Sequence, residues 1–224
     1  MGELNYIYAP ESPLTEQFRC RVPMKGTRQL FVVNGGVQGT RTPLSISLEK
    51  GQVMEEVLQV ISVRTEGSPL EIAYKNNLHF GEGSQARIVL CSHTFTLDKF
   101  VTDEEVDITL EDRAVVDVVV MQNEHNEATH NTRFNITAGA GSVLKISFLT
   151  LHGGNIDNKV RVDINGEGAN VDLSGLYLVD GKQMVSNSVE MNHNVPNCIS
   201  SQLYKGILDN EAKGNFSGII YVKQ

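Results

Sequence analysis

Short runs in which apolar and polar residues alternate recur along the middle of the chain. Residues 86–113, 114–141 and 142–168 align as three successive units of 28, 28 and 27 residues. Each unit holds two alternating runs, separated by a polar segment rich in turn-forming residues. Alternation with a period of two places every second side chain on one face of a β-strand. The pattern therefore predicts two strands in each unit.

The three units carry apolar side chains at equivalent positions. Taken unit by unit, these positions are Ile88, Val116 and Leu144; Leu90, Val118 and Ile146; Val106, Phe134 and Val162; and Ile108, Ile136 and Ile164. One more step of 28 residues towards the N-terminus reaches Leu78 and Phe80. A fixed period with two strands per unit is typical of a β-solenoid, whose stacked coils bury a continuous apolar face. We therefore predict an all-β solenoid with about 28 residues per repeat.

An antiparallel β-sandwich is the alternative, because its strands also alternate. A sandwich gives no reason for a constant spacing with equivalent side chains, so the repeat favours the solenoid. In the solenoid, Ile108, Ile136 and Ile164 are expected to stack as an internal ladder.

The pattern weakens on both sides of the repeat. Val171 and Leu173 open another coil, whose return strand is expected late, after an insertion over residues 181–201. Residues 202–212 would close that coil, and residues 214–224 would begin one more. Near the N-terminus, residues 32–39 (VVNGGVQG) predict a strand and a turn. The apolar spacing over residues 51–61 suits a short helix.

Composition narrows the class of protein. The 224 residues are 40% hydrophobic and carry a net charge of −8, which argues against disorder and against partners such as nucleic acids or anionic membranes. No run approaches the length of a membrane helix, and the N-terminus does not resemble a signal peptide. The three cysteines Cys20, Cys91 and Cys198 form no CxxC pair, so reduced thiols in the cytoplasm are expected.

Histidines are the first candidates for chemistry. His125 and His130 lie close in sequence to Glu124 and Glu127, and nitrogen and carboxylate ligands suit a transition metal. The segment is a predicted loop, however, and it lacks the helical HExxH frame of zinc hydrolases. A solvated corner is the favoured interpretation.

The remaining candidates are more isolated. His152 and His193 are isolated and are interpreted as satisfied or surface histidines. His193 precedes Cys198 by five residues, and such a pair can activate a thiolate, but no third orienting residue or nucleophile motif accompanies it. Cys91 alternates with apolar residues in a repeat strand and is expected to face outward or into a corner.

Glycines and acidic residues are interpreted as structural. Residues 139–142 and 166–169 fall at equivalent corners, where glycine permits turns with positive φ. They lack the Lys-Ser/Thr ending of a phosphate loop. The acidic cluster over residues 103–105 is interpreted as a solvated edge. Composition and spacing therefore predict no catalytic residue and no metal site.

Four stretches nevertheless resemble the SufB/SufD family of iron–sulfur cluster assembly proteins. They are residues 76–90, 176–183, 192–209 and 214–222. The most specific part is the run that contains His193, Pro196, Cys198, Ser200, Gln202 and Lys205. The resemblance extends over most of residues 28–224 and is closer to SufD than to SufB.

The resemblance implies a right-handed parallel β-helix that serves as a scaffold or accessory subunit and is not itself an enzyme. Its implied partners are a SufB-like paralogue and the ATPase SufC, on which clusters are assembled from iron and sulfur and then passed to apo-proteins. SufD is associated with iron acquisition as well. The cluster is expected only transiently in the full complex, and the chain alone is expected to hold none.

The chain is shorter than typical family members. Residues 1–224 are expected to form a single β-helix core that lacks the flanking helical regions, and with them the SufC-binding segment. Three dispersed cysteines do not make a four-ligand cluster site, so a partner chain would have to complete one. Unpaired strand edges in the last coil favour pairing, and we expect self-association through the end coils.

Two other functions stay open. Parallel β-helices also occur in polysaccharide lyases and hydrolases, which need carboxylates along an exposed groove. Asp107, Asp117 and Asp163 are the scattered candidates for that role. A self-polymerising structural solenoid is the third reading, and filaments in electron micrographs would favour it.

Overall fold

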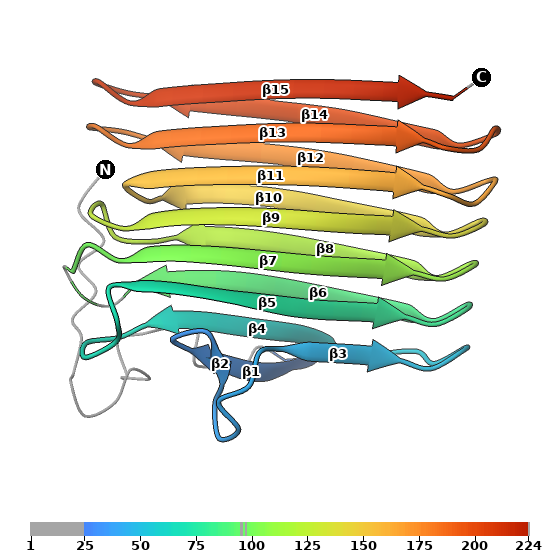
Figure 1. The fold of residues 1–224 in the computed structure, drawn as a ribbon, viewed down its shortest axis with the longest axis horizontal. Coiled ribbons are helices and arrows are strands. Elements are labelled where there is room, and N and C mark those ends of the chain that lie inside the picture. Colours follow the sequence, from blue (N-terminus) through green and yellow to red (C-terminus); the bar gives the residue numbers. More distant parts are fainter. Residues whose placement is uncertain (1–24, 95, 97, 224) are drawn as a thin grey trace.

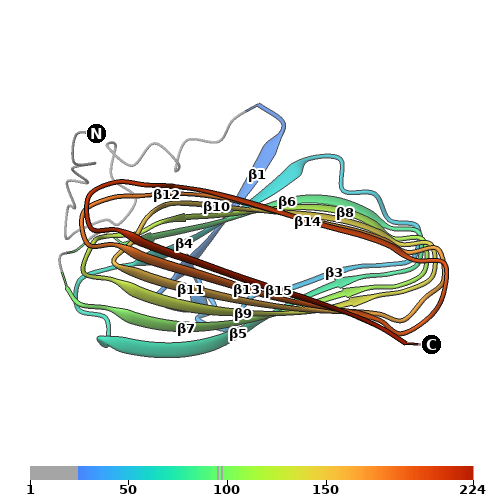
Figure 2. The ribbon, with the colours of Figure 1, turned by 90° about the horizontal axis from the view of Figure 1, so that it is seen from above.

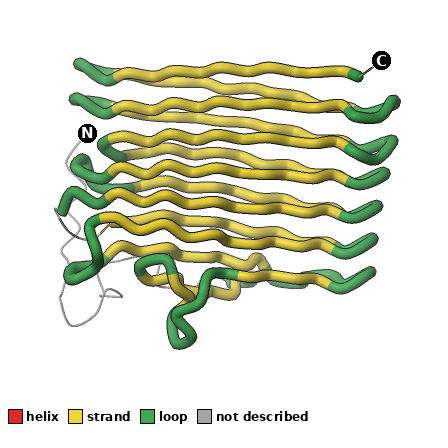
Figure 3. The backbone as a smooth tube through the Cα atoms, viewed as in Figure 1, coloured by secondary structure: helices red, strands yellow, loops and turns green. Residues whose placement is uncertain are grey.

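A computed structural model of the protein describes residues 25–223 except residues 95 and 97. Within these residues the regular structure is entirely β, in two facing sheets of eight and seven strands (Figures 1 and 3). Odd-numbered strands from β3 onward form the front sheet of Figure 1 and run from left to right. Even-numbered strands return behind them while the chain climbs, so the solenoid is right-handed. Figure 2 shows its flattened cross-section.

The strands of the stacked coils are almost all ten residues long. Their bounds are β1 (Thr27–Val33), β2 (Gly36–Val37), β3 (Ser45–Leu48), β4 (Val57–Arg64), β5 (Glu71–Phe80), β6 (Gln85–Thr94), β7 (Val101–Leu110), β8 (Val115–Asn123), β9 (Thr129–Ala138), β10 (Val143–His152), β11 (Asn155–Ile164), β12 (Asn170–Val179), β13 (Met184–His193), β14 (Ile199–Leu208) and β15 (Lys213–Val222). The predicted strand and turn over residues 32–39 are confirmed as the antiparallel pair β1 and β2.

All other neighbouring strands pair in parallel, which confirms the predicted solenoid. The coil length varies around the predicted period. Phe134 pairs with Val160, 26 residues on, whereas Ile88 pairs with Val118, 30 residues on. Turns of different length absorb this variation, because the strands themselves stay in register.

The variation corrects the predicted ladder. The stacked column is Ile108, Ile136 and Val162, while Ile164 lies beside Ala138. The equal-spacing alignment was wrong here because the coil between β9 and β11 is two residues shorter than the coil between β7 and β9. A shift of two positions keeps every side chain on the same face of its strand, so the predicted residues still point into the core.

Two further predictions are wrong. Residues 181–201 contain no insertion, because β13 occupies the regular position of a return strand, with Met191 beside Val162. Residues 51–61 form no helix, because β4 begins at Val57. Both faces of β4 are largely buried, so its apolar residues lose the period of two and mimic helical spacing.

Two edges of the flattened solenoid differ in construction. At the turn edge, formed by residues 81–84, 111–114, 139–142, 165–169 and 194–198, each odd strand turns tightly into the next even strand. Gly141 and Gly168 have positive φ there, as the corner interpretation predicted. Their N–H groups donate to carbonyls of the following coil, at Glu167 and Asn197. We call the opposite edge, where the odd strands begin, the loop edge.

The two ends of the solenoid are also unequal. At the N-terminal end the β1–β2 hairpin packs its Gly35 against the ring of Tyr74. At the C-terminal end, β14 and β15 have no further strand beside them among the described residues. The inward-facing side chains Phe216, Ile220 and Val222 are therefore 41%, 51% and 71% exposed. In the described part of the chain, no helix is long and apolar enough to cross a bilayer.

Candidate functional site at the open end of the solenoid

The last coil replaces aliphatic core residues with polar ones. Ser200 of β14 lies beside Val171 of β12, and His193 of β13 lies beside Ile164 of β11. Gln202 occupies the next inward position of β14. The mouth of the open end therefore presents an imidazole, a hydroxyl and an amide at positions where the coils below carry hydrocarbon.

His193 and Ser200 contact each other directly across the turn edge. The Nε2 atom of His193 lies 2.8 Å from the Oγ atom of Ser200, and both side chains are partly buried. The backbone N–H of Lys223 donates to the carbonyl of His193 and holds the end of β13 in place. The contact with Ser200 holds the ring across the turn edge.

Cys198 closes the same turn. Its Sγ atom lies 3.4 Å from the carbonyl oxygen of Gly166, 3.3 Å from that of Pro196 and 3.6 Å from that of Val195. Surrounded by acceptors, the thiol acts as a hydrogen-bond donor. Two coils below, Ser142 makes an equivalent contact just before β10, with its Oγ atom 2.7 Å from the carbonyl of Gly139.

Aromatic rings extend this mouth into the core. Tyr204 stacks on Phe216 with ring centroids 4.6 Å apart, and it lies 6.5 Å from Phe148. Phe148 in turn meets Phe134 edge to face at 5.1 Å. Burial raises the pKa of Tyr204 above the usual range of a phenol. The column connects four strands and reaches solvent at Phe216.

A second polar cluster lies inside the solenoid near the loop edge. His130 is 1% exposed, with its Nδ1 atom 2.6 Å from Glu124 and its Nε2 atom 3.2 Å from Glu104. Glu124 is 3% exposed. The predictions of a solvated corner for His130 and Glu124 and of a solvated edge for Glu104 are therefore wrong. The strand register turns the side chains of His130 and Glu104 inward, where opposite charges compensate their burial. His125 and Glu127 do lie at the surface corner, as predicted.

The interior ionisable groups have shifted pKa values. Burial by itself lowers the pKa of His130, but the charge of Glu124 and hydrogen bonds with Glu104 and Glu124 raise it to about 10. Burial opposes ionisation of Glu124, yet the positive charge of His130 lowers its pKa. For His93, burial outweighs the charge of Glu124 and a backbone hydrogen bond at Asn123, and lowers the pKa to about 4.

Buried amides continue the polar interior towards the open end. Gln122 accepts a hydrogen bond of 2.8 Å from Thr150 and exchanges hydrogen bonds with Asn158. Asn158 also donates to Asn187 at 3.1 Å. Sequence reasoning missed this network. Its only signal was a set of polar residues in the same phase as the aliphatic core positions.

Comparison with known protein families now adds to this geometry. Residues 63–224 match the family described as "SUF system FeS cluster assembly, SufBD core domain". The chain belongs to this family. Membership of the SufBD family supports a role in iron–sulfur cluster assembly, and residues 63–224 of the solenoid are its SufBD core domain.

Curated relatives carry the same family name. The chain is 28% identical over 108 residues to the iron-sulfur cluster assembly SufBD family protein ML0594 of Mycobacterium leprae, a match that covers 48% of this chain and 28% of that protein. It is 26% identical over 108 residues to the SufBD family protein Rv1462 of Mycobacterium tuberculosis, covering 48% and 27%. The matched segment is therefore less than a third of either relative.

The residues of the SufBD-like run separate into two groups. His193, Cys198, Ser200 and Gln202 gather at the turn edge and mouth of the last coil, whereas Lys205 projects from the outer face of β14 and is exposed. Pro196 is exposed in the turn itself. Among the described residues, no three His, Cys, Asp or Glu side chains are arranged to hold a metal ion. Thiol and imidazole suit iron, but two such groups fall short of a cluster site.

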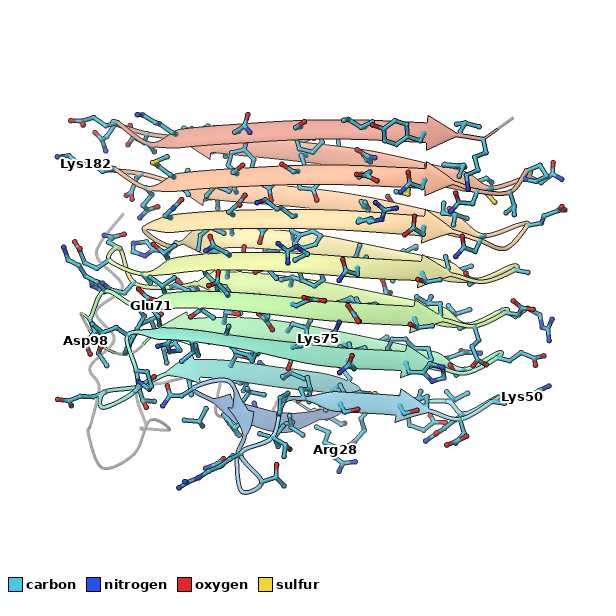
Figure 4. The ribbon with its side chains drawn as sticks, in the orientation of Figure 1. Arg28, Lys50, Glu71, Lys75, Asp98 and Lys182 are labelled. Atoms are coloured by element: carbon cyan, nitrogen blue, oxygen red, sulfur yellow. The ribbon has the colours of Figure 1, made fainter. Side chains whose placement is uncertain are left out.

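An outer groove of about 600 Å³ is where the carboxylates of a polysaccharide lyase or hydrolase would be expected. It crosses β5, β7, β9 and β11, and its lining includes Asp103, Glu105 and Asp157. Asp103 accepts a hydrogen bond from Asn131, and Glu105 lies 2.7 Å from Lys75, which Figure 4 labels on the outer face of β5. The three acidic residues named from the sequence do not form a free carboxylate pair in this groove either. Lys75 also pairs with Asp107, Arg161 pairs with Asp163, and Asp117 stands on the other sheet.

Of the other cysteines and histidines, Cys91 takes an outward position on β6 beside Ile61 and Met121, yet it is only 1% exposed. His152 contacts the carbonyl of Glu124 through Nδ1 at 2.7 Å, so the prediction of a satisfied histidine is confirmed. Cys20 lies outside the described residues. Neither of the two described thiols forms a disulfide.

Proposed function

We propose that the chain is the β-helical core of a SufD-like scaffold subunit, which supports iron–sulfur cluster assembly and iron acquisition in the cytoplasm. Its partners in the full-length protein would be a SufB-like paralogue and a SufC-like ATPase, with no part for nucleic acid or membrane. The observation that best supports this proposal is the open last coil, where two unpaired strand edges surround an apolar mouth with polar residues at its rim.

The arrangement suits binding better than chemistry. Cys198 donates its hydrogen to backbone carbonyls. In the outer groove, the carboxylates of Asp103 and Glu105 are hydrogen-bonded or ion-paired. A cluster or an iron ion would therefore be cargo that a partner chain helps to hold. His193 and Cys198 are the two groups of this chain that would contribute ligands.

The mouth also favours self-association of the chain alone. Ile220 faces the mouth and is 51% exposed, whereas Ile207, 60% exposed on the same coil, lies on the outer face of β14. We expect Ile220→Glu to convert an oligomer into a monomer in light scattering and Ile207→Glu to leave it assembled. A monomeric unsubstituted chain would contradict association through the end coil.

Co-purification tests the scaffold role directly. The full-length protein, expressed with its SufB-like and SufC-like candidates, should retain both on an affinity column and yield a complex that accepts iron and sulfide. Retention of neither would reject the proposed function. Turnover of acidic glycans by the purified chain, or filaments in electron micrographs, would instead favour the enzyme or the structural reading.

A further inference from the structure

The interior cluster at the loop edge contains one histidine between two carboxylates. Both ring nitrogens of His130 contact carboxylate oxygens, at 2.6 Å from Glu124 and 3.2 Å from Glu104. The side chain comes from β9, and the two carboxylates come from the segment after β8 and from β7. The cluster therefore joins the front sheet to the end of a rear strand.

The two contacts of the His130 ring need one proton on each nitrogen–oxygen line. A neutral imidazole carries one N–H and one acceptor nitrogen, and an ionised carboxylate can only accept. Two nitrogen–carboxylate contacts therefore need one proton more than a neutral histidine and two ionised acids supply. That proton sits either on the ring or on one of the carboxylates.

The other oxygen of each carboxylate already has a hydrogen-bond donor. Thr94 donates its hydroxyl hydrogen to the second oxygen of Glu124 at 2.5 Å, and Asn76 donates its amide to the second oxygen of Glu104 at 2.7 Å. Only the two oxygens that face the ring could then carry the extra proton, and an imidazole is a stronger base than a carboxylate, so the proton stays on the ring. We propose that His130 is held as a buried imidazolium between two ionised carboxylates and locks the two sheets together at the loop edge.

The surrounding charges support the lock. Arg64 of β4 donates to Thr102 at 2.7 Å and lies 4.1 Å from the centre of the Phe100 ring, inside the same part of the core. The two positive charges, on Arg64 and His130, then balance the two negative charges of the carboxylates, so the net charge of the cluster is zero. His93 of β6 stays neutral, and Tyr74 of β5 is kept un-ionised because burial raises its pKa. A neutral sum avoids the cost of burying net charge.

The lock has a defined pH range. A histidine whose folded pKa is raised stabilises the fold fully below the pKa of the unfolded chain, and this contribution is lost as pH rises through the folded value. The raised pKa of His130, about 10, places that loss in the alkaline range. The ion pairs of His130 with Glu104 and Glu124 are thus formed at neutral pH and are lost only in alkali.

Nitrogen NMR of the chain labelled in its histidines tests the proposal. At pH 8, both ring nitrogens of His130 should give the signals of a protonated ring, and the signals of His79, whose side chain is 45% exposed, serve for comparison. A neutral tautomer of His130 at pH 8 would overturn the proposal. This measurement on the unsubstituted protein needs no variant to fold.

A matched pair of variants tests the role of the carboxylates. Glu104→Gln keeps the shape and one acceptor but removes the inward charge, whereas Glu105→Gln removes the outward charge next to it on β7. The former should lower the alkaline midpoint of the His130 signals by about one pH unit or more. The latter should leave it in place. Equal effects of the two substitutions would contradict a specific contact.

Discussion

Tyr204 of β14 pairs with Gly175 of β12, and the tyrosine ring fills the space beside the glycine. The reverse pair stands two residues further on, where Tyr177 of β12 covers Gly206 of β14. Each tyrosine needs a neighbour without a side chain, because a Cβ atom at either glycine would overlap the ring. The last two coils on this sheet are thus interlocked by shape.

This relationship predicts that Gly175→Ala destabilises the protein by about 1–3 kcal/mol, as overpacking of a core does. The cost should fall when Tyr204 is first replaced by leucine, because the overlapping ring is then absent. Chemical denaturation of the two single variants and the double variant gives the coupling energy. Additive effects would mean that the ring and the added methyl group do not meet.

The corrected ladder makes a second prediction. Ile136 is buried between Ile108 and Val162, so Ile136→Ala should lower the free energy of unfolding by about 2–5 kcal/mol. The neighbouring Thr137 faces outward on the same strand, and Thr137→Ala should change the free energy by less than about 0.5 kcal/mol. Similar losses at both positions would contradict the assigned faces of β9.

These two cases show what the pattern of the sequence could and could not establish. Alternation identified the inward face of β9 correctly, because a register shift of two positions does not change the face. The same pattern could not place Ile164, since the coil between β9 and β11 is shorter than its neighbours. Coil length depends on turn geometry, which the strand residues do not encode.

The polar interior escaped prediction for a different reason. His130 was assigned to the surface because its segment was predicted to be a loop, and Glu104 because it belongs to an acidic cluster, which is rarely buried. They are buried together, and only the stacking of β7 and β9 brings them into contact. Cys198 and His193 belong to one run of the sequence, but their separate contacts, to carbonyls and to Ser200, depend on the shape of the last turn.

His93 predicts how the protein responds to acid. Its pKa falls from about 6.5 in the unfolded chain to about 4 in the fold, so below pH 6.5 the unfolded state binds more protons. Stability should therefore decrease as pH falls from 6.5 to 4, by up to about 3 kcal/mol from this group. His93→Gln should remove most of that slope in thermal melts across this range. The exposed His79→Gln serves as the control, and an unchanged slope in His93→Gln would contradict the assignment.

The contacts of Cys198 predict that its hydrogen-bond donor matters more than its sulfur. Serine can donate to the same carbonyls of Gly166 and Pro196, whereas valine fills the space and donates nothing. We expect the free energy of unfolding of Cys198→Ser to lie within about 1 kcal/mol of that of the unsubstituted chain, and Cys198→Val to lose about 1–3 kcal/mol, because the carbonyl of the buried Gly166 is left without its donor. Urea denaturation measures both. A larger loss in the serine variant than in the valine variant would show that the sulfur packs as an apolar atom, and the thiol would then be free to serve as a ligand.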